Sequence, residues 1–150
     1  LGKDTNQQYL LSQFVKRGVG AERISMLGPA RHYEFLETYG QIDIALDTFP
    51  YNGGTTTTEA IWQGVPVVAY WGNRWVSRTS ATLLRTAGLG ELVAEDVLAY
   101  VRLASRLADD PQTLKTMRET MREKLLASDV CDTKAFARSM ERIYLDIWQR

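Results

Sequence analysis

The pattern of hydrophobic and polar positions divides the chain into a helical beginning, an alternating middle and a helical end. Apolar residues recur at helical spacing in seven segments, residues 6–18, 32–40, 55–63, 77–88, 96–108, 111–127 and 133–148. Short apolar runs predict strands at residues 23–27, 42–46 and 65–70, and at most a short strand within 91–94. Strands alternating with helices over short links indicate an α/β fold with a parallel sheet.

This pattern predicts a Rossmann-like parallel sheet with flanking helices, followed by extra helices at the carboxyl end. Pro111, behind Asp109 and Asp110, marks a helix start, and Gly64 suits a left-handed helix end. The last helix carries one broad apolar stripe: Phe136, Met140, Ile143, Tyr144, Ile147 and Trp148. No linker, repeat or low-complexity stretch interrupts residues 1–150, so we expect a single domain.

Composition narrows the possible partners and compartment. The 150 residues include 18 basic and 18 acidic side chains, so net charge predicts neither a nucleic-acid nor a membrane partner. A single cysteine, Cys131, excludes an internal disulfide and fits a reducing, cytoplasmic compartment. No apolar run approaches the roughly 20 residues that span a bilayer, and the first residues lack the apolar core of a signal peptide. Because the chain opens with a helix, where nucleotide-binding α/β units usually open with a strand, we expect a piece of a longer protein.

The most informative stretch is DTFPYNGGTTTTEAIWQGVPVV, residues 47–68, in which a strand ends and a helix begins. Ligands of open parallel sheets bind at this carboxyl edge. Gly53 and Gly54 let the backbone approach a ligand closely, while the helix start and the threonine hydroxyls suit a phosphate group. Asp47, directly after the strand, is placed to accept backbone N–H groups of the loop. An alternative needs no ligand, since residues 56–59 also match a capping box made by Thr56 and Glu59.

Four stretches of the sequence resemble a known family. The segments DIALDTFPYNGGTTTTEAIWQGVPVV and GNRWVSRTSATLLRTAGLGELVAE, with LADDP and MERIYLDIW further on, are similar to the O-linked N-acetylglucosamine transferase family. That family includes bacterial members and the SPINDLY-type O-fucosyltransferases. The resemblance extends over residues 23–148. It implies that the chain is the carboxyl-terminal, nucleotide-sugar-binding half of a GT-B glycosyltransferase.

The resemblance also implies roles for individual residues. In the family, residues after the Asn-Gly pair contact the diphosphate and an acidic residue in the next helix holds the ribose, which gives Gly54, Thr55 and Thr56 for the diphosphate and Glu59 for the ribose. Backbone before the preceding helix contacts the uracil, which points to Pro29, Ala30 and Arg31. The remaining substrate-binding candidates are His32, Asn52, Gly53, Thr57 and Arg78.

Two histidines common in the family are replaced here. Gly54 and Phe35 occupy their positions, and His32, one helical turn before Phe35, is a candidate substitute. For Arg78 the alternative is a helix start capped by Ser77. No residue of this chain is predicted to be catalytic.

The function implied is inverting, metal-independent transfer of N-acetylglucosamine from a UDP-sugar to serine or threonine of acceptor proteins, without a cofactor. No D-x-D pair is present to hold a metal. A GDP-fucose-dependent O-fucosyltransferase and a non-catalytic interaction module that keeps the fold remain alternatives. The expected partners are the sugar donor, acceptor proteins, the protein's own amino-terminal half and upstream helical repeats. Without that half, the chain is expected to be inactive alone.

Overall fold

The computed structural model describes residues 3–149, which form two compact units. The units are Leu1–Phe35 and Leu36–Arg150, and each is considered by itself. Helix α2 (His32–Thr38) crosses the boundary between them and continues into a 3-10 turn, Tyr39–Gln41. The expectation of a single domain stays a prediction.

The first unit is helical among its described residues. Helix α1 (Lys3–Val15) confirms the first predicted helix, and Gly18 follows it with φ of +84°, a left-handed conformation that favours glycine. The predicted strand at residues 23–27 is wrong, because a 3-10 turn, Ala21–Arg23, is followed by irregular backbone. A strand forms only when another strand takes up its backbone hydrogen bonds, and this unit offers no such partner among its described residues.

The second unit is built on a three-stranded parallel sheet in the order β1-β2-β3. Strand β1 (Ala45–Leu46) pairs with β2 (Val67–Tyr70), with Ala45 opposite Val67, and β2 pairs with β3 (Val93–Ala94), with Ala69 opposite Val93. The strands lie where the apolar runs predicted them, although β1 and β3 are only two residues long. This confirms the α/β class with a parallel sheet.

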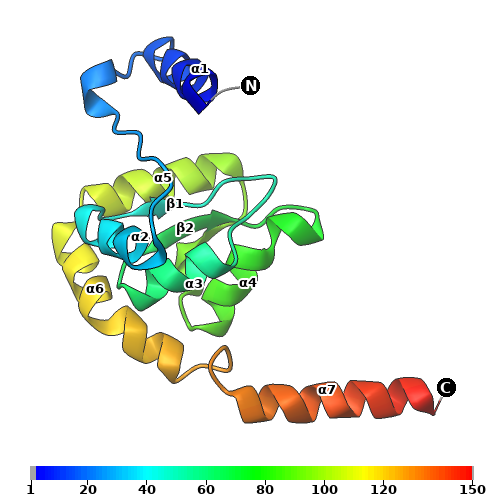
Figure 1. The fold of residues 1–150 in the computed structure, drawn as a ribbon. Helices are drawn as coiled ribbons and strands as arrows, with labels where there is room; N and C mark the ends of the chain where they lie inside the picture. Colours follow the sequence, from blue (N-terminus) through cyan, green and yellow to red (C-terminus); the bar gives the residue numbers. More distant parts are fainter. Residues whose placement is uncertain (1–2, 150) are drawn as a thin grey trace. The chain divides into compact units, whose positions relative to one another are not determined.

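Helices cover the sheet on both faces. In Figure 1 the sheet lies between α5 (Val97–Ala108) on one side and α3 (Thr55–Trp62) and α4 (Thr79–Thr86) on the other. Helix α6 (Pro111–Leu126) packs against α3 and α5. The apolar centre of this arrangement is fully buried and includes Ile61, Val68, Leu84, Leu89, Leu92, Met121 and Leu125.

Helix ends follow the signals expected from the sequence. Gly64 and Gly88 adopt left-handed conformations just after α3 and α4. Asp96 and Asp110 cap α5 and α6 by accepting the backbone N–H groups of Ala99 and Thr113. Pro111 occupies the first turn of α6, as predicted.

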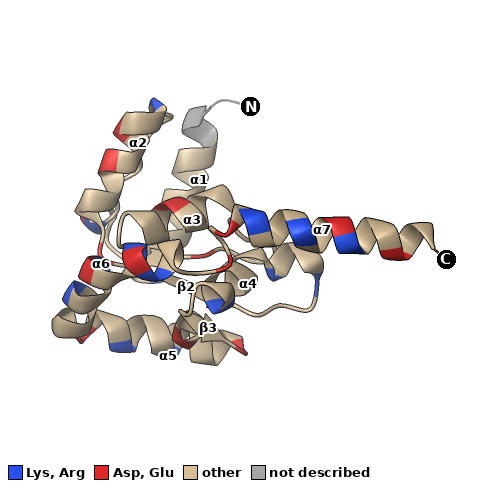
Figure 2. Ribbon diagram, turned by 90° about the horizontal axis from the view of Figure 1, so that it is seen from below, with Lys and Arg blue, Asp and Glu red and all other residues tan. Residues whose placement is uncertain are grey.

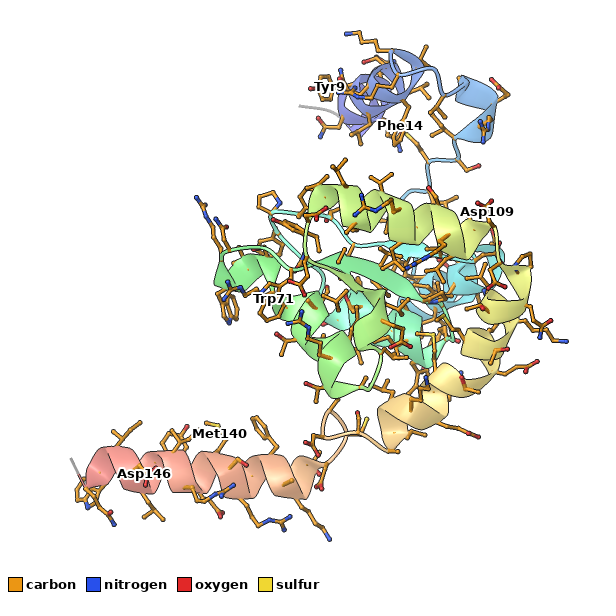
Figure 3. All side chains as sticks on the ribbon, turned by 180° about the vertical axis from the view of Figure 1, so that it is seen from behind. Tyr9, Phe14, Trp71, Asp109, Met140 and Asp146 are labelled. Carbon is orange, nitrogen blue, oxygen red and sulfur yellow. The ribbon has the colours of Figure 1, made fainter. Side chains whose placement is uncertain are left out.

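The final helix, α7 (Thr133–Trp148), keeps its apolar stripe exposed. None of its described residues is buried, and Phe136, Tyr144, Ile147 and Trp148 each expose more than 60% of their surface. Side chains around Met140 extend from α7 in Figure 3. Acidic and basic residues are mixed along α6 and α7, as Figure 2 shows, in keeping with the balanced net charge. Within the described residues, no helix is both long and apolar enough to cross a bilayer.

Candidate functional site

The candidate site lies where β1 and β2 end and two loops meet. After β1, residues 47–54 lead to α3, and after β2, residues 71–78 lead to α4. The backbone N–H of Asn52 donates to the carbonyl of Val76 at 2.9 Å, which joins the two loops directly. The sheet therefore brings together segments that are separate in sequence at its carboxyl edge, where open parallel sheets bind ligands.

Asn52 shapes the first loop from inside. Its side chain is buried, and its Nδ2 donates to the carbonyl of Thr48 at 2.9 Å. The hydroxyl of Thr48 in turn donates to the carbonyl of Tyr51 at 3.2 Å. The Asn52 side chain thus closes the turn that precedes the glycine pair, and its contact with a substrate stays a prediction.

Both backbone polar groups of Gly53 are held by side chains. Its N–H donates to Oδ1 of Asp47 at 2.9 Å, and its carbonyl accepts the hydroxyl of Ser80 at 2.9 Å. Asp47 and Ser80 are both buried, at 8% and 0% exposure. Asp47 lies at the end of β1 and Ser80 lies on α4, so one glycine is fixed from two different elements. The expectation that Asp47 accepts a loop N–H is confirmed.

The four threonines divide into two groups. Thr57 is buried and its Oγ1 is 2.8 Å from Oγ of Ser80, while Thr58 donates its hydroxyl to the Gly54 carbonyl at 3.2 Å. The side chains of Thr55 and Thr56 are exposed. Thr55 and Thr56 therefore present their hydroxyls at the surface of the loop, whereas the hydroxyl of Thr57 is buried against Ser80. The ligand contacts of these threonines stay predictions.

The start of α3 decides against the capping box. Gly54 is the residue before the helix, with φ of −135°, and no side chain makes a capping hydrogen bond there. Thr56, the cap in that alternative, lies inside the first turn instead. The first backbone N–H groups of a helix have no partner within the helix, so this end of α3 offers donors and a partial positive charge to an anion.

Glu59 lies one turn further along α3, next to Tyr39. The hydroxyl of Tyr39 donates to the carbonyl of Thr56 at 3.1 Å. Burial, followed by the negative charge of Glu59, raises the pKa of Tyr39. A pocket of about 220 Å³ opens here, lined among others by Tyr39, Asp47, Gly53 and Thr56. The carboxylate of Glu59 is thus close enough to the Tyr39 hydroxyl to act on it electrostatically.

Asp47 is unusual for an acidic residue because it is buried with one oxygen, Oδ2, that has no hydrogen-bond partner. Burial raises its pKa, although the Gly53 N–H and the Ser80 hydroxyl oppose the rise. Tyr100 on α5 donates its hydroxyl to the Asp47 carbonyl at 3.0 Å. Burial and then the charge of Asp47 raise the pKa of Tyr100 to about 12.

Arg78 holds its own loop. Its Nε donates to the carbonyl of Gly72 at 2.7 Å, and its guanidinium lies 4.9 Å from the centre of the Trp71 ring. Arg85 approaches the same ring at 4.1 Å. The tryptophan, labelled in Figure 3, and two arginines therefore order the loop after β2. Ser77, the capping alternative, accepts the Arg74 N–H and donates to the Arg74 carbonyl.

The residues predicted to contact the nucleobase, together with His32, belong to the first unit. Pro29, Ala30 and Arg31 are exposed and precede α2, and His32 begins that helix with its ring 5.8 Å from the Tyr33 ring. The glycine–threonine loop belongs to the second unit. Their contacts with a nucleotide therefore stay predictions. Among the described residues, no three His, Cys, Asp or Glu side chains group as metal ligands.

The sequence analysis missed Ser80, Tyr39 and Tyr100. Each is a polar residue on the buried face of a helix or turn, and each donates to a backbone carbonyl of the site. The sequence did offer one signal for Ser80. It lies four positions before Leu84, so both residues fall on the same face of α4. A buried serine needs a polar partner, and the loop backbone supplies it.

Comparisons with known proteins agree with this architecture. Residues 4–140 match the family described as Glycosyl transferase family 41. The chain is 38% identical over 149 residues to a barley (Hordeum vulgare) protein named "Probable UDP-N-acetylglucosamine--peptide N-acetylglucosaminyltransferase SPINDLY", covering 98% of this chain and 16% of that protein. It is 30% identical to the Caenorhabditis elegans UDP-N-acetylglucosamine--peptide N-acetylglucosaminyltransferase, covering 96% of this chain and 12% of the relative.

A solved structure supports the fold. The K341M mutant of the Thermobaculum terrenum O-GlcNAc transferase superposes with a TM-score of 0.87 at 40% sequence identity, covering 94% of this chain and 27% of that chain. The expected Rossmann-like fold is thereby confirmed. The chain spans only about one sixth of the length of its plant relatives. With a family match over residues 4–140, the chain belongs to glycosyl transferase family 41, the O-linked N-acetylglucosamine transferase family, and corresponds to part of its carboxyl-terminal catalytic region.

Proposed function

We propose that this chain is the nucleotide-sugar-binding part of an inverting protein O-glycosyltransferase that uses a UDP-sugar. The donor sugar proposed is N-acetylglucosamine, and the acceptors are serine or threonine hydroxyls of other proteins. The names of the barley, nematode and bacterial relatives support this choice. The rest of the catalytic machinery, including the general base that takes the acceptor proton, is proposed to lie in the amino-terminal half of the full-length protein.

One observation carries the proposal. A loop fixed at Gly53 presents two exposed threonine hydroxyls, Thr55 and Thr56, at the open start of α3. Hydroxyls, backbone N–H groups and the helix dipole together form a site for a diphosphate that needs no lysine. Glu59, one turn later, is proposed to accept the ribose hydroxyls, and the backbone of Pro29, Ala30 and Arg31 to contact the nucleobase. His32 is proposed to replace a histidine that is common in the family.

The chemistry proposed is a single displacement at the anomeric carbon. The acceptor oxygen forms a bond to that carbon while the bond to the diphosphate oxygen breaks, and the acceptor proton passes to a base outside this chain. Negative charge collects on the leaving diphosphate, where Thr55, Thr56 and the α3 amides stabilise it. We propose that no metal takes part, since the sequence lacks the D-x-D pair that metal-dependent transferases use.

A GDP-fucose donor is the second candidate. The plant SPINDLY relatives are 34–38% identical to this chain, and the sequence resembles SPINDLY-type O-fucosyltransferases. Proposed partners besides the donor are acceptor proteins, the amino-terminal half and upstream helical repeats. A cytoplasmic location is proposed, with no nucleic-acid or membrane partner.

A transfer assay tests the proposal. Full-length protein is incubated with acceptor protein and either UDP-N-acetylglucosamine or GDP-fucose, labelled in the sugar, in the presence of EDTA. We expect label from the UDP-sugar to enter serine or threonine as the β-anomer. Transfer from GDP-fucose alone would move the assignment to fucosyl transfer. Intact protein that transfers neither sugar would favour the non-catalytic interaction module.

A further inference from the structure

The hydroxyl of Ser80 contacts two groups of the site. It donates to the Gly53 carbonyl at 2.9 Å and lies 2.8 Å from Oγ1 of Thr57. Since a hydroxyl has one proton and Ser80 gives it to Gly53, the bond to Thr57 is donated by Thr57. Ser80 therefore links α4 to the glycine of the loop and to the first turn of α3.

Asp47 holds the opposite side of the same glycine. Its Oδ1 accepts the Gly53 N–H at 2.9 Å, and its burial at 8% exposure keeps the carboxyl group in place. With the N–H and the carbonyl of Gly53 both tied, the peptide planes on either side of this residue cannot rotate freely. The next backbone N–H groups, those of Gly54 and Thr55, are thus oriented before any ligand arrives.

We propose that Ser80 and Asp47 are positioning residues that preorganise the glycine–threonine loop for the diphosphate of the donor nucleotide. This inference rests on the proposed function, since it assigns how that same site gains affinity. Ser80 and Asp47 act on the ligand through Gly53. Preorganised donors bind an anion more tightly, because the ordering cost of the loop is met during folding.

The geometry makes the effect specific to phosphate. Ser80 and Asp47 bond to the loop backbone, while the residues proposed for the base lie in the first unit and the proposed ribose acceptor, Glu59, lies on α3. Releasing Gly53 should therefore weaken binding of a nucleoside diphosphate and leave binding of the nucleoside almost unchanged. A general loss of folding would weaken both.

The test compares Ser80→Ala with wild type in the full-length protein. Calorimetry gives the dissociation constant for UDP, ligand-observed NMR gives that for uridine, and GDP with guanosine is measured in the same way. Ser128→Ala is the matched control, because Ser128 also donates its hydroxyl to a backbone carbonyl, that of Leu125, away from the loop. Asp47→Ala and Asp47→Asn form a second pair, since the amide oxygen of asparagine can still accept the Gly53 N–H.

We expect Ser80→Ala to weaken diphosphate binding roughly tenfold and to change nucleoside binding less than about twofold. Asp47→Ala should act in the same direction and Asp47→Asn should retain most of the affinity, while Ser128→Ala matches wild type. Unchanged UDP and GDP affinity in Ser80→Ala, or an equal loss for nucleotide and nucleoside, would overturn the inference alone. Wild-type protein that binds neither nucleotide would overturn the inference and the proposed function together.

Discussion

Gly53 is the residue at which the loop has least room for change. A Cβ atom placed there would lie 2.7 Å from Oγ1 of both Thr56 and Thr57. The Thr57 hydroxyl cannot turn aside without losing its bond to Ser80. We expect Gly53→Ala to lower the free energy of unfolding by about 1–3 kcal/mol, measured by urea denaturation.

Its neighbour provides the control for this prediction. At Gly54 the nearest atom to an added Cβ is Cγ2 of Thr79, at 3.8 Å, and the φ of −135° lies outside the left-handed region that favours glycine. Gly54→Ala should change the free energy of unfolding by less than about 0.5 kcal/mol. Equal losses at the two glycines would contradict the packing described around Gly53.

The buried carboxyl group of Asp47 makes stability depend on pH. Burial raises its pKa above the unfolded value, so the folded state binds the proton more tightly. The stability that it contributes is present below the unfolded pKa and is lost as pH rises through the folded pKa. Asp47→Asn, which stays neutral, should gain stability relative to wild type as pH rises from about 4 to 7.

Urea denaturation of both proteins at several pH values measures this difference. Asp110→Asn is a useful comparison, because hydrogen bonds from Thr113 lower the pKa of Asp110. Its contribution has the opposite sign and is lost as pH falls through the folded pKa. A difference between Asp47→Asn and wild type that stays constant with pH would show that Asp47 keeps an ordinary pKa in the fold.

Sequence alone drew attention to the loop itself and to Asp47, but it missed Ser80, which holds the loop from behind. The Gly-Gly-Thr run has a chemical meaning that can be recognised locally, and Asp47 follows a strand end where loop amides are near. Ser80 comes 27 positions after Gly53 in the sequence. It reaches the loop only because the chain folds back through β2 and α4. Such a contact depends on the tertiary arrangement, which residue patterns do not specify.

At the scale of elements, the close approach of α3 and α6 depends on Gly64. Its φ is +77°, and an added Cβ would lie 2.5 Å from the backbone carbonyl oxygen of Arg118 on α6. Arg122, one turn later on α6, donates from Nε to the carbonyl of Trp62 at 2.7 Å and lies over its ring. We expect Gly64→Ala to lower the free energy of unfolding by at least about 2 kcal/mol, in a urea denaturation experiment.

Gly88 distinguishes the two causes of that loss, which are the left-handed backbone and the close contact with α6. It has a similar φ of +70°, but nothing lies within 4 Å of an added Cβ. Gly88→Ala should therefore cost only the backbone term, about 1 kcal/mol. If both variants lose the same stability, the contact between Gly64 and α6 contributes nothing beyond the left-handed turn.

Helices were predicted more accurately than strands, for a physical reason. Each helix carries its own hydrogen bonds and end signals, such as Asp110 with Pro111 or Gly64, so local sequence is enough. A strand depends on a neighbour in another part of the chain. The apolar run at residues 42–46 yields only the two paired residues of β1, and the run at 23–27 yields none.

At the scale of the whole molecule, we propose that this chain supplies one part of a larger catalytic unit. Its relatives are several times longer, and no base for the proposed transfer was identified in its sequence. We expect residues 1–150, expressed alone, to show no sugar transfer to acceptor protein under conditions in which the full-length protein is active. Turnover by the isolated chain would place a complete catalytic centre within it.

The central claim, that the glycine–threonine loop binds a nucleotide diphosphate, is tested most directly by calorimetric titration of the full-length protein with UDP and with GDP. The variant is Thr55→Val/Thr56→Val, which removes the two exposed hydroxyls, and Thr116→Val on α6 is its control. We predict that wild type and the control bind UDP and that the double variant loses most of this affinity. Binding of either nucleotide with unchanged affinity in the double variant, or no binding by wild type, would contradict it.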